Sequence, residues 1–578
     1  MTQVSGKLIT RNYTQFRGVD FSNRKDEINI YRSPDALNMW KNYKNSNGKC
    51  IETRPDIELQ AEYSNTIFGL FFYESNGEIR AVVHSGTKLY YGNTEIYSGM
   101  AEHKSNYFVF DGLLYIMDGT NYLVFNGTTV SAVTGYIPTT TISKSPSGGG
   151  TIYEEINLLS PYRINSFCSD GVSTEYVLDS QNLDNEMVRV WIINDQGVKE
   201  EITTGFTPNY TDGTVTFDTA PGIPYTDGQD NVFIQFKKAV SGNADRILNC
   251  TLTEVFDNRV FFSGNPEFKN YLWFSKLYDP TYIGDYSYYP EGEEDSAIKS
   301  IVSGNNALWV MKEPSQSNTT IFYHNPSLDD DQSKVYPSTH SSISTGCKTT
   351  GINFKDTICF YSENGLEAIT GDVTTEQAIT HKSSLVDAKL LNEEEYDNMI
   401  LEEWEGYLLT IVGNKIYLAD SRQYSQINEH YEYEWFYFEF DQQIIGTQVK
   451  NGVLYLCTKE TISGTTKYRV YSLTNIGDRK VKAYWTTLED EFNYPQYQKI
   501  TNKKGCVVDM EGKDITIYAR TDNKAYDLIK KYANVKGYVV PRIKKKKWKS
   551  IQLKFYSDKP FQLYSSTLES YVGSYIKR

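Results

Sequence analysis

Short apolar, aromatic-rich runs follow turns that contain Gly, Asn or Asp along most of the chain. Such units lie at residues 86–91, 111–116, 304–310, 355–360, 405–410, 413–418 and 451–456. Asn-Gly and Asp-Gly pairs supply the positive φ that tight hairpin turns require, so these units in series predict a meander of antiparallel strands. From Asp356 through Gly406 to Gly452 the spacing is roughly 50 residues, about the length of one four-stranded blade, whereas the earlier spacings are irregular. The pattern predicts a β-propeller with degenerate blades.

Other segments follow different patterns. Residues 139–150 are rich in Thr, Ser, Pro and Gly, which is typical of a linker or exposed loop, and residues 153–238 contain the short strands of a small β-sandwich. Beyond residue 483 alternating strands return. Helical patterns occur only at residues 385–399 and 526–532, where we expect short connectors.

These patterns together predict an all-β chain, a β-propeller with an inserted β-sandwich domain and a C-terminal β domain. The predicted divisions are an N-terminal arm and docking segment (1–60), the first blades (61–140), the inserted sandwich (141–243), the remaining blades (244–480) and the C-terminal domain (481–578).

The composition supports the all-β prediction and limits the kinds of partner that the chain can bind. With 578 residues, the chain is longer than one hydrophobic core usually grows, and its 47 Tyr, 27 Phe and 8 Trp favour strands. The formal charge of −15 argues against a general nucleic-acid binder, because phosphate binding needs a basic face. An acidic wall would let DNA slide past, although an acidic balance more commonly serves solubility.

Targeting and redox signals are sparse. Seven cysteines are scattered without a short metal-ligand spacing, as expected for buried thiols of a protein that folds in a reducing cytoplasm. The polar N-terminus predicts no signal peptide, and the longest apolar run, residues 67–73, is too short to cross a bilayer. We therefore expect no membrane span.

The sequence shows no local signature of catalysis. No two of its six histidines stand at i, i+4, and nucleotide-binding and acyl-transfer motifs are absent. Acidic triplets at residues 293–295, 329–331 and 393–395 are expected to be solvated loops. We predict no catalytic, cofactor-binding or metal-binding residues, and hence no enzyme.

A basic run lies near the C-terminus. It consists of Lys544, Lys545, Lys546 and Lys547, followed by Trp548. The lysines could contact phosphate and the indole could stack on a base. The more conservative interpretation is a charged edge strand that discourages wrong pairing.

Two stretches resemble one family. The first comprises residues 17–22, 32–39 and 52–56, and the second runs through residues 257–266 and 273–275 to 279–282. Both resemble tailed-phage proteins of the packaged-DNA stabilisation, tail accessory, nozzle or tail tubular type. Residues 213–221 and 230–232 are similar to an inserted β domain of the same family.

The resemblance implies a noncatalytic component of the virion tail, assembled in the host cytoplasm. Copies would form a ring, expected as a hexamer, below the portal or an adaptor protein and above other tail proteins. Packaged DNA would be retained by the ring and later pass through its channel without sequence-specific binding. We expect the channel wall to be acidic or neutral.

The first family-like stretch also has local physical interpretations. Ser33 could cap a helical turn that begins at Pro34. Five charged residues could brace the chain internally or form ion pairs across a subunit or portal-adaptor boundary: Arg17, Asp20, Arg32, Asp35 and Arg54.

Two other functions stay open. A propeller glycosidase acting on host surface sugars would need two carboxyl groups in a deep, sugar-sized pocket. A tail-tip receptor-binding protein would use exposed tyrosine-rich loops, such as residues 282–289, to contact carbohydrate.

Overall fold

The computed structural model forms two compact units, residues 1–72 with 345–578, and residues 73–344. It describes residues 6–46, 49–75, 77–316, 319–330, 334–371, 373–375, 378–425, 430–474 and 480–575. The all-β prediction is confirmed, since nearly every element is a strand. The α-helices of the described residues have four residues each: α1 (Tyr43–Ser46), α2 (Asp245–Leu248) and α3 (Asp387–Leu390). None of these helices has the length and hydropathy that crossing a bilayer requires.

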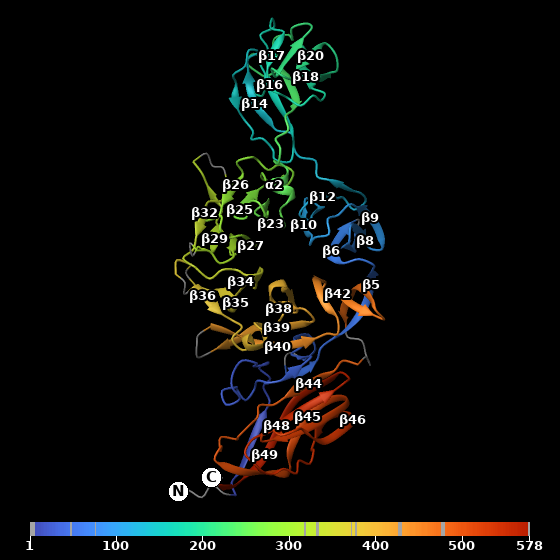
Figure 1. Cartoon of the computed structure of the whole chain (residues 1–578), viewed down its shortest axis with the longest axis vertical. Coiled ribbons are helices and arrows are strands. Elements are labelled where there is room, and N and C mark those ends of the chain that lie inside the picture. The colour runs from blue at the N-terminus through green and yellow to red at the C-terminus, as the bar shows by residue number, and fades with distance from the viewer. Residues whose placement is uncertain are drawn as a thin grey trace. The chain divides into compact units, whose positions relative to one another are not determined.

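Four-stranded antiparallel sheets recur on either side of an insertion in the second unit (Figure 1). The first two sheets are β6 (Ile67–Ser75), β7 (Glu78–Ser85), β8 (Lys88–Tyr91) and β9 (Thr94–Ser98), then β10 (Asn106–Phe110), β11 (Leu113–Met117), β12 (Tyr122–Phe125) and β13 (Val130–Ala132). The next two are β23 (Leu252–Phe256), β24 (Arg259–Ser263), β25 (Tyr271–Phe274) and β26 (Tyr288–Pro290), then β27 (Ile298–Gly304), β28 (Ala307–Lys312), β29 (Ile321–His324) and β32 (Ser338–His340). A small hairpin, β30 (Ser327–Leu328) and β31 (Lys334–Val335), precedes β32. Strands within these sheets follow chain order, as in a meander.

The insertion consists of two sheets with one core. A six-stranded sheet has the order β15-β14-β16-β22-β18-β19, and a three-stranded sheet has the order β17-β21-β20. Their bounds are β14 (Thr139–Lys144), β15 (Thr151–Ile152), β16 (Tyr162–Phe167), β17 (Glu175–Val177), β18 (Arg189–Ile193), β19 (Lys199–Ile202), β20 (Phe206–Asn209), β21 (Thr214–Phe217) and β22 (Val232–Lys237). Phe167 and Ile234 of the larger sheet share a buried cluster with Tyr176 and Phe217 of the smaller one.

The first unit contains three more four-stranded arrangements. One is β33 (Gly351–Phe354), β34 (Thr357–Ser362), β35 (Gly365–Ile369) and β36 (Ile379–His381), and the next is β37 (Ile400–Trp404), β38 (Tyr407–Val412), β39 (Lys415–Ser425) and β40 (His430–Glu439). The third is β41 (Gln443–Lys450), β42 (Val453–Ile462), β43 (Thr465–Thr474) and β5 (Asp56–Tyr63). Its last strand, β5, comes from the N-terminal part of the chain and pairs with β43.

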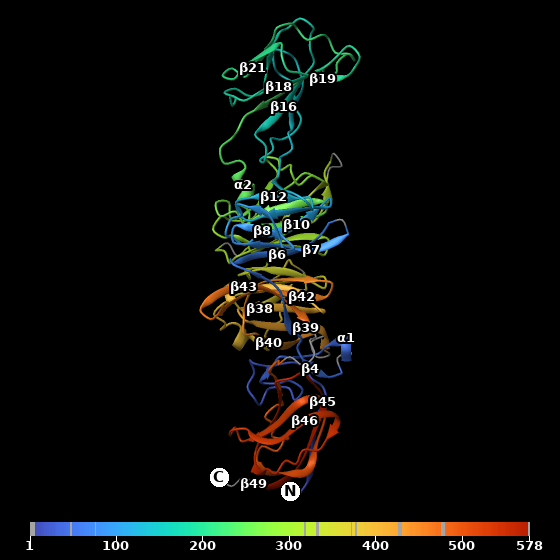
Figure 2. The same ribbon diagram turned by 90° about the vertical axis from the view of Figure 1, so that its right-hand side faces the viewer.

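A large sheet joins the two ends of the chain within the first unit, and it continues into β40, β39, β38 and β37 because β3 pairs with β40. N-terminal β1 (Leu8–Tyr13), β2 (Ala36–Leu37), β3 (Met39–Trp40) and β4 (Ile51–Thr53) interleave with C-terminal β44 (Ala483–Thr486), β45 (Tyr497–Thr521), β46 (Asp527–Val539), β47 (Lys546–Trp548), β48 (Ile551–Ser557) and β49 (Phe561–Tyr575). β1 pairs antiparallel with β49, from Leu8 opposite Tyr571 to Tyr13 opposite Ser566. β45 and β46 lie side by side in both views (Figures 1 and 2).

Local predictions had mixed outcomes. Predicted hairpin turns are confirmed at Asp111-Gly112, with φ of 47° and 73°, and at Asn451-Gly452, with φ of 51° and 77°. Residues 385–399 contain only α3 and a 3-10 turn, η2 (Tyr396–Asn398). The predicted helical connector at residues 526–532 is wrong, because most of it belongs to β46.

Candidate functional site

The first family-like stretch is built into the interior of the first unit. The Val19 N–H donates to the Trp435 carbonyl of β40 at 2.6 Å, and the Ser33 N–H donates to the Gly18 carbonyl at 2.9 Å. Val19 and Ser33 are fully buried. The Gly18 backbone has φ +80°, and a Cβ placed there would lie 2.2 Å from the Trp435 carbonyl oxygen. Only glycine fits this approach of the two backbones.

Asp20 stabilises a turn rather than an ion pair. Its Oδ1 accepts the backbone N–H groups of Ser22 at 3.3 Å and Asn23 at 3.0 Å, and its Oδ2 accepts the Asn23 amide at 3.0 Å. The predicted Ser33 helix cap is wrong, because no helix follows Pro34. The Ser33 hydroxyl accepts the Asp35 N–H at 3.3 Å instead, since a serine side chain can stabilise a turn as well as a helix end.

Arg17 lies beside a buried ion pair. Its guanidinium is 3.9 Å from the Glu434 carboxylate, whose other oxygen is 2.7 Å from the Lys41 ammonium. Burial raises the pKa of Glu434, and the Lys41 charge opposes this shift. The Arg17 side chain is 45% exposed, so its cation is accessible from the solvent side of this pair.

Arg54 is the most enclosed of the predicted arginines. It donates to the Asn38 side-chain oxygen at 2.9 Å, the Pro55 carbonyl at 2.8 Å and the Glu439 carbonyl at 3.3 Å. Its guanidinium lies 4.0 Å from the centre of the Phe440 ring. Burial lowers the pKa of Arg54 to about 10. Arg54 therefore acts as an internal brace between the N-terminal segment and β40.

The two remaining predicted residues lie near the same segment. The exposed Asp35 accepts the Tyr484 hydroxyl at 2.8 Å and lies 3.8 Å from the Lys554 ammonium. Arg32 is half-buried, and its backbone N–H donates to the Asn29 carbonyl at 2.9 Å. Contacts within the chain are thus established for Arg17, Asp20, Asp35 and Arg54, while a contact across a subunit boundary stays a prediction.

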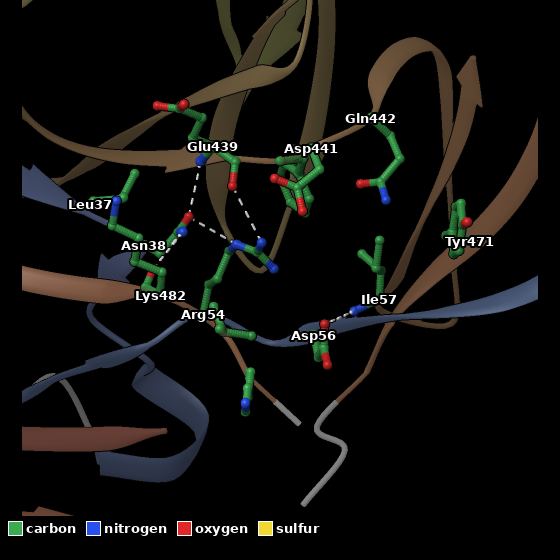
Figure 3. A pocket seen from close by; sticks show the side chains of 13 residues that line it. Leu37, Asn38, Arg54, Asp56, Ile57, Glu439, Asp441, Gln442, Tyr471 and Lys482 are labelled. Atoms are coloured by element: carbon green, nitrogen blue, oxygen red, sulfur yellow. Dashed lines mark hydrogen bonds between the residues drawn. The ribbon is translucent and has the colours of Figure 1, made fainter. Parts of the chain in front are cut away.

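A pocket of about 590 Å³ opens beside Arg54 (Figure 3). Its wall includes the acidic residues Asp56, Glu439 and Asp441 together with Lys480 and Lys482. The Asp56 carboxylate accepts the Ile57 backbone N–H at 2.8 Å, and the Glu439 carboxylate accepts the Tyr437 hydroxyl at 3.0 Å. The pocket therefore carries side chains of both charges beside Arg54, whose guanidinium donates three hydrogen bonds within the chain.

The predicted phosphate contacts lie at the edge of the C-terminal strands. Lys544, Lys546 and Lys547 are exposed, whereas Lys545 forms an ion pair with Asp527. Trp548 is 1% exposed, so the idea that it stacks on a base is wrong. Its indole packs in the hydrophobic core instead.

The acidic triplets and the tyrosine-rich loop are only partly exposed to solvent. Glu293 and Asp295 are exposed, as expected, but Glu393 is largely buried and accepts the Tyr417 hydroxyl at 2.6 Å. The prediction of a solvated loop is wrong there, because strand β39 carries a hydroxyl and an ammonium that bind the carboxylate. Asp331 lies outside the described residues. Of the tyrosines proposed for carbohydrate, Tyr286 is 78% exposed but Tyr282 is buried.

No sequence pattern indicated that His381 lies between two carboxylates, those of Glu367 and Asp387. His381 Nε2 lies 2.7 Å from Asp387 and its Nδ1 lies 3.2 Å from Glu367. Hydrogen bonds to Asp387 and Glu367 raise the pKa of His381 to about 10. In the sequence the three residues are spaced at 14 and 6 positions. The pairing of β35 with β36 places Glu367 opposite His381, and Asp387 comes from the following helix, α3. Among the described residues no group of His, Cys, Asp and Glu is arranged to hold a metal ion.

Replacing His381 with glutamine should lower stability mainly at neutral and acidic pH. Because the folded pKa is raised above the unfolded value, the contribution is fully present below about pH 6.5 and disappears as pH rises through about 10. We expect a loss of roughly 1 kcal/mol at pH 6, discounted for the partial exposure of the ring. Urea unfolding of His381→Gln at pH 6 and pH 10 measures this, with the exposed His103→Gln as the control. A loss equal at both pH values contradicts the prediction.

Comparisons with known proteins give no family. No protein-family model and no curated protein matches the chain. An exo-β-1,3-galactanase from Phanerochaete chrysosporium is 7% identical, over 55% of this chain and 94% of its own, with a TM-score of 0.21. BBS1N, solved in complex with ARL6DN, is 9% identical over 74% and 98%, with a TM-score of 0.25. A Trypanosoma rangeli sialidase is 8% identical over 55% and 90%, with a TM-score of 0.19. These TM-scores are too low to establish a shared fold.

Proposed function

We propose that the chain is a noncatalytic structural protein of a phage tail, which forms a ring around the DNA channel below the portal or its adaptor. The observation that carries the proposal is the role of the family-like residues 17–56. Gly18 lets this segment approach the backbone of β40, Asp20 stabilises a turn within the segment, and Arg54 donates to the Glu439 carbonyl of β40. Such residues specify a scaffold, which is what a conduit protein requires.

The sheet arrangement supports the propeller part of this proposal. Six four-stranded antiparallel sheets occur along the described residues, and β37 to β40 form a further run of four antiparallel strands within the large sheet. β5 completes the last of these sets from the N-terminal side. A strand from one end of the chain that completes the last sheet is the usual way to close a propeller, because closure leaves few free edges. We propose that these sets are the blades and that the insertion between β13 and β23 is a separate domain within the series.

The charge of the chain suits a channel wall. A formal charge of −15 repels phosphate, so DNA would slide rather than adhere. The proposed partners are copies of the chain in a ring, expected as a hexamer, the portal or adaptor, other tail proteins, and packaged DNA without sequence-specific binding.

Particle imaging tests the ring directly. The purified full chain should form closed rings in negative stain, and labelled antibody against it should decorate the tail axis next to the portal of virions. Monomers at all concentrations together with labelling confined to peripheral fibres would overturn the proposal.

The pocket beside Arg54 favours one second candidate, a carboxylate glycosidase. Asp56, Glu439 and Asp441 line a volume that could hold a sugar, and retaining or inverting hydrolysis needs two such groups. Chromogenic glycosides assayed with the wild type and with Asp441→Asn distinguish the two candidates. Hydrolysis that the variant abolishes would favour the enzyme, and its absence in the wild type would exclude these substrates.

A further inference from the structure

Charge is unevenly distributed along the chain. Residues 481–578 contain 20 Lys and Arg against 10 Asp and Glu, a formal charge of +10, while the other 480 residues contain 38 against 63, a formal charge of −25. The C-terminal segment is therefore basic although the whole chain is acidic, and the net charge of the chain does not show this.

The cations gather along one edge of the large sheet. β46 and β47 both pair with β45 on the side opposite β49, since β45 residues 499–500 and 508–512 pair with β49 as well. Residues 527–549 therefore form one edge. They contain nine Lys and Arg and a single acidic residue, Asp527.

This edge is open within the described residues. β46 has 13 residues, none of them buried, and β45 is the one strand with which it pairs. By contrast, the far side of β49 is covered by β1 and β4. Ile529, Tyr532 and Val535 anchor β46 against the core, so the strand presents a fixed row of backbone N–H and C=O groups.

Carboxylates already pair with this strand from its inner side. Lys536 lies 3.3 Å from Glu511, the residue opposite it on β45, and Lys531 lies 3.6 Å from Asp514. An acidic strand added on the outer side would meet the exposed Lys530 of β46 in the same cross-strand manner. The exposed Lys544 lies in the segment between β46 and β47 and adds to the positive charge there. Lysines attract an acidic strand and repel a basic one, so this edge would select an acidic strand.

Apolar side chains complete the edge. Leu528 is 63% exposed, Tyr538 is 76% exposed and Val540 is 51% exposed. Such groups contribute little to phosphate binding but pack well against the side chains of an added strand. We infer that the β46 edge binds an acidic, extended segment of a partner protein by β-strand addition.

Binding of a designed probe tests this inference on the full chain. The probe is a fluorescein-labelled peptide of six Glu-Val repeats, followed by fluorescence anisotropy. The wild type should bind it more weakly as NaCl is raised, and the double variant Lys530→Glu with Lys544→Glu should bind at least roughly tenfold more weakly, because two attractive pairs become repulsive. Lys459→Glu, which changes an exposed lysine of β42, should leave binding unchanged. Hydrogen exchange should show β46 amides protected by the peptide.

Three outcomes would overturn the inference. Equal binding of a peptide with prolines at two central positions would mean that no backbone ladder forms. Tighter binding of a 20-base-pair DNA duplex, lost in the same double variant, would identify a polyanion site. Wild-type oligomers that the double variant dissociates, with no peptide binding, would identify a second copy of this chain as the occupant. Imaging of the full chain without the peptide shows whether rings form, and this result tests the proposed function separately from the inference about β46.

Discussion

Replacing Gly18 with alanine is expected to destabilise the first unit by at least about 4 kcal/mol, among the largest effects of a single substitution. The new Cβ would lie 2.2 Å from the Trp435 carbonyl oxygen and 2.8 Å from its nitrogen, and both are backbone atoms that cannot rotate away. Relieving the clash would break the bond from the Val19 N–H to that carbonyl. Differential scanning calorimetry should show a lowered or missing transition.

Gly464→Ala provides the matched control. Gly464 has φ +81°, almost identical to the +80° of Gly18, but nothing lies within 4 Å of its added Cβ. The control should therefore cost only the strain of a left-handed backbone, about 1 kcal/mol. Equal losses in the two variants would show that backbone strain, and not the contact with β40, governs Gly18.

Replacing Arg54 with methionine is expected to cost about 3–4 kcal/mol. Methionine fills much of the volume but removes one N–H donor from each of the Pro55 carbonyl, the Glu439 carbonyl and the Asn38 side-chain oxygen. The Asn38 oxygen keeps the Glu439 N–H as its other donor. Buried acceptors without partners carry a desolvation penalty, and the contact with Phe440 is also lost. Chemical unfolding at neutral pH measures the change.

Arg24→Met controls for the removal of an arginine from the same segment. The Arg24 side chain is 78% exposed, and its one ion pair among the described residues is with the exposed Asp26, so the expected loss is below about 0.5 kcal/mol. If Arg54→Met were as mild as Arg24→Met, the brace described for Arg54 would be wrong.

The sequence predicted features that depend on a few adjacent residues. The turn at Asn451-Gly452 has positive φ at both positions, and the neighbouring runs pair as the hairpin of β41 and β42. Local steric rules determine such turns, so no knowledge of distant residues is needed. The same rules predicted strands through most of the chain.

Features that depend on distant partners could not be predicted in detail. The sequence indicated that Arg54 was charged and near a proline, but its acceptor at Glu439 lies 385 positions away. His381 showed no local motif because Glu367 reaches it through strand pairing. The helical prediction for residues 526–532 is wrong because most of this segment pairs with β45 as part of β46, and a short local pattern does not show such a pairing.

The pairing of β1 with β49 constrains the order in which a nascent chain can fold. Residues 8–13 cannot pair until residues 566–571 have been synthesised. At about 5–20 residues per second, this happens roughly half a minute to two minutes later. Residues 73–344 are synthesised in the interval and form their own compact unit. The middle of the chain can therefore fold first, and the N-terminal strands stay exposed to chaperones until the last strand leaves the ribosome.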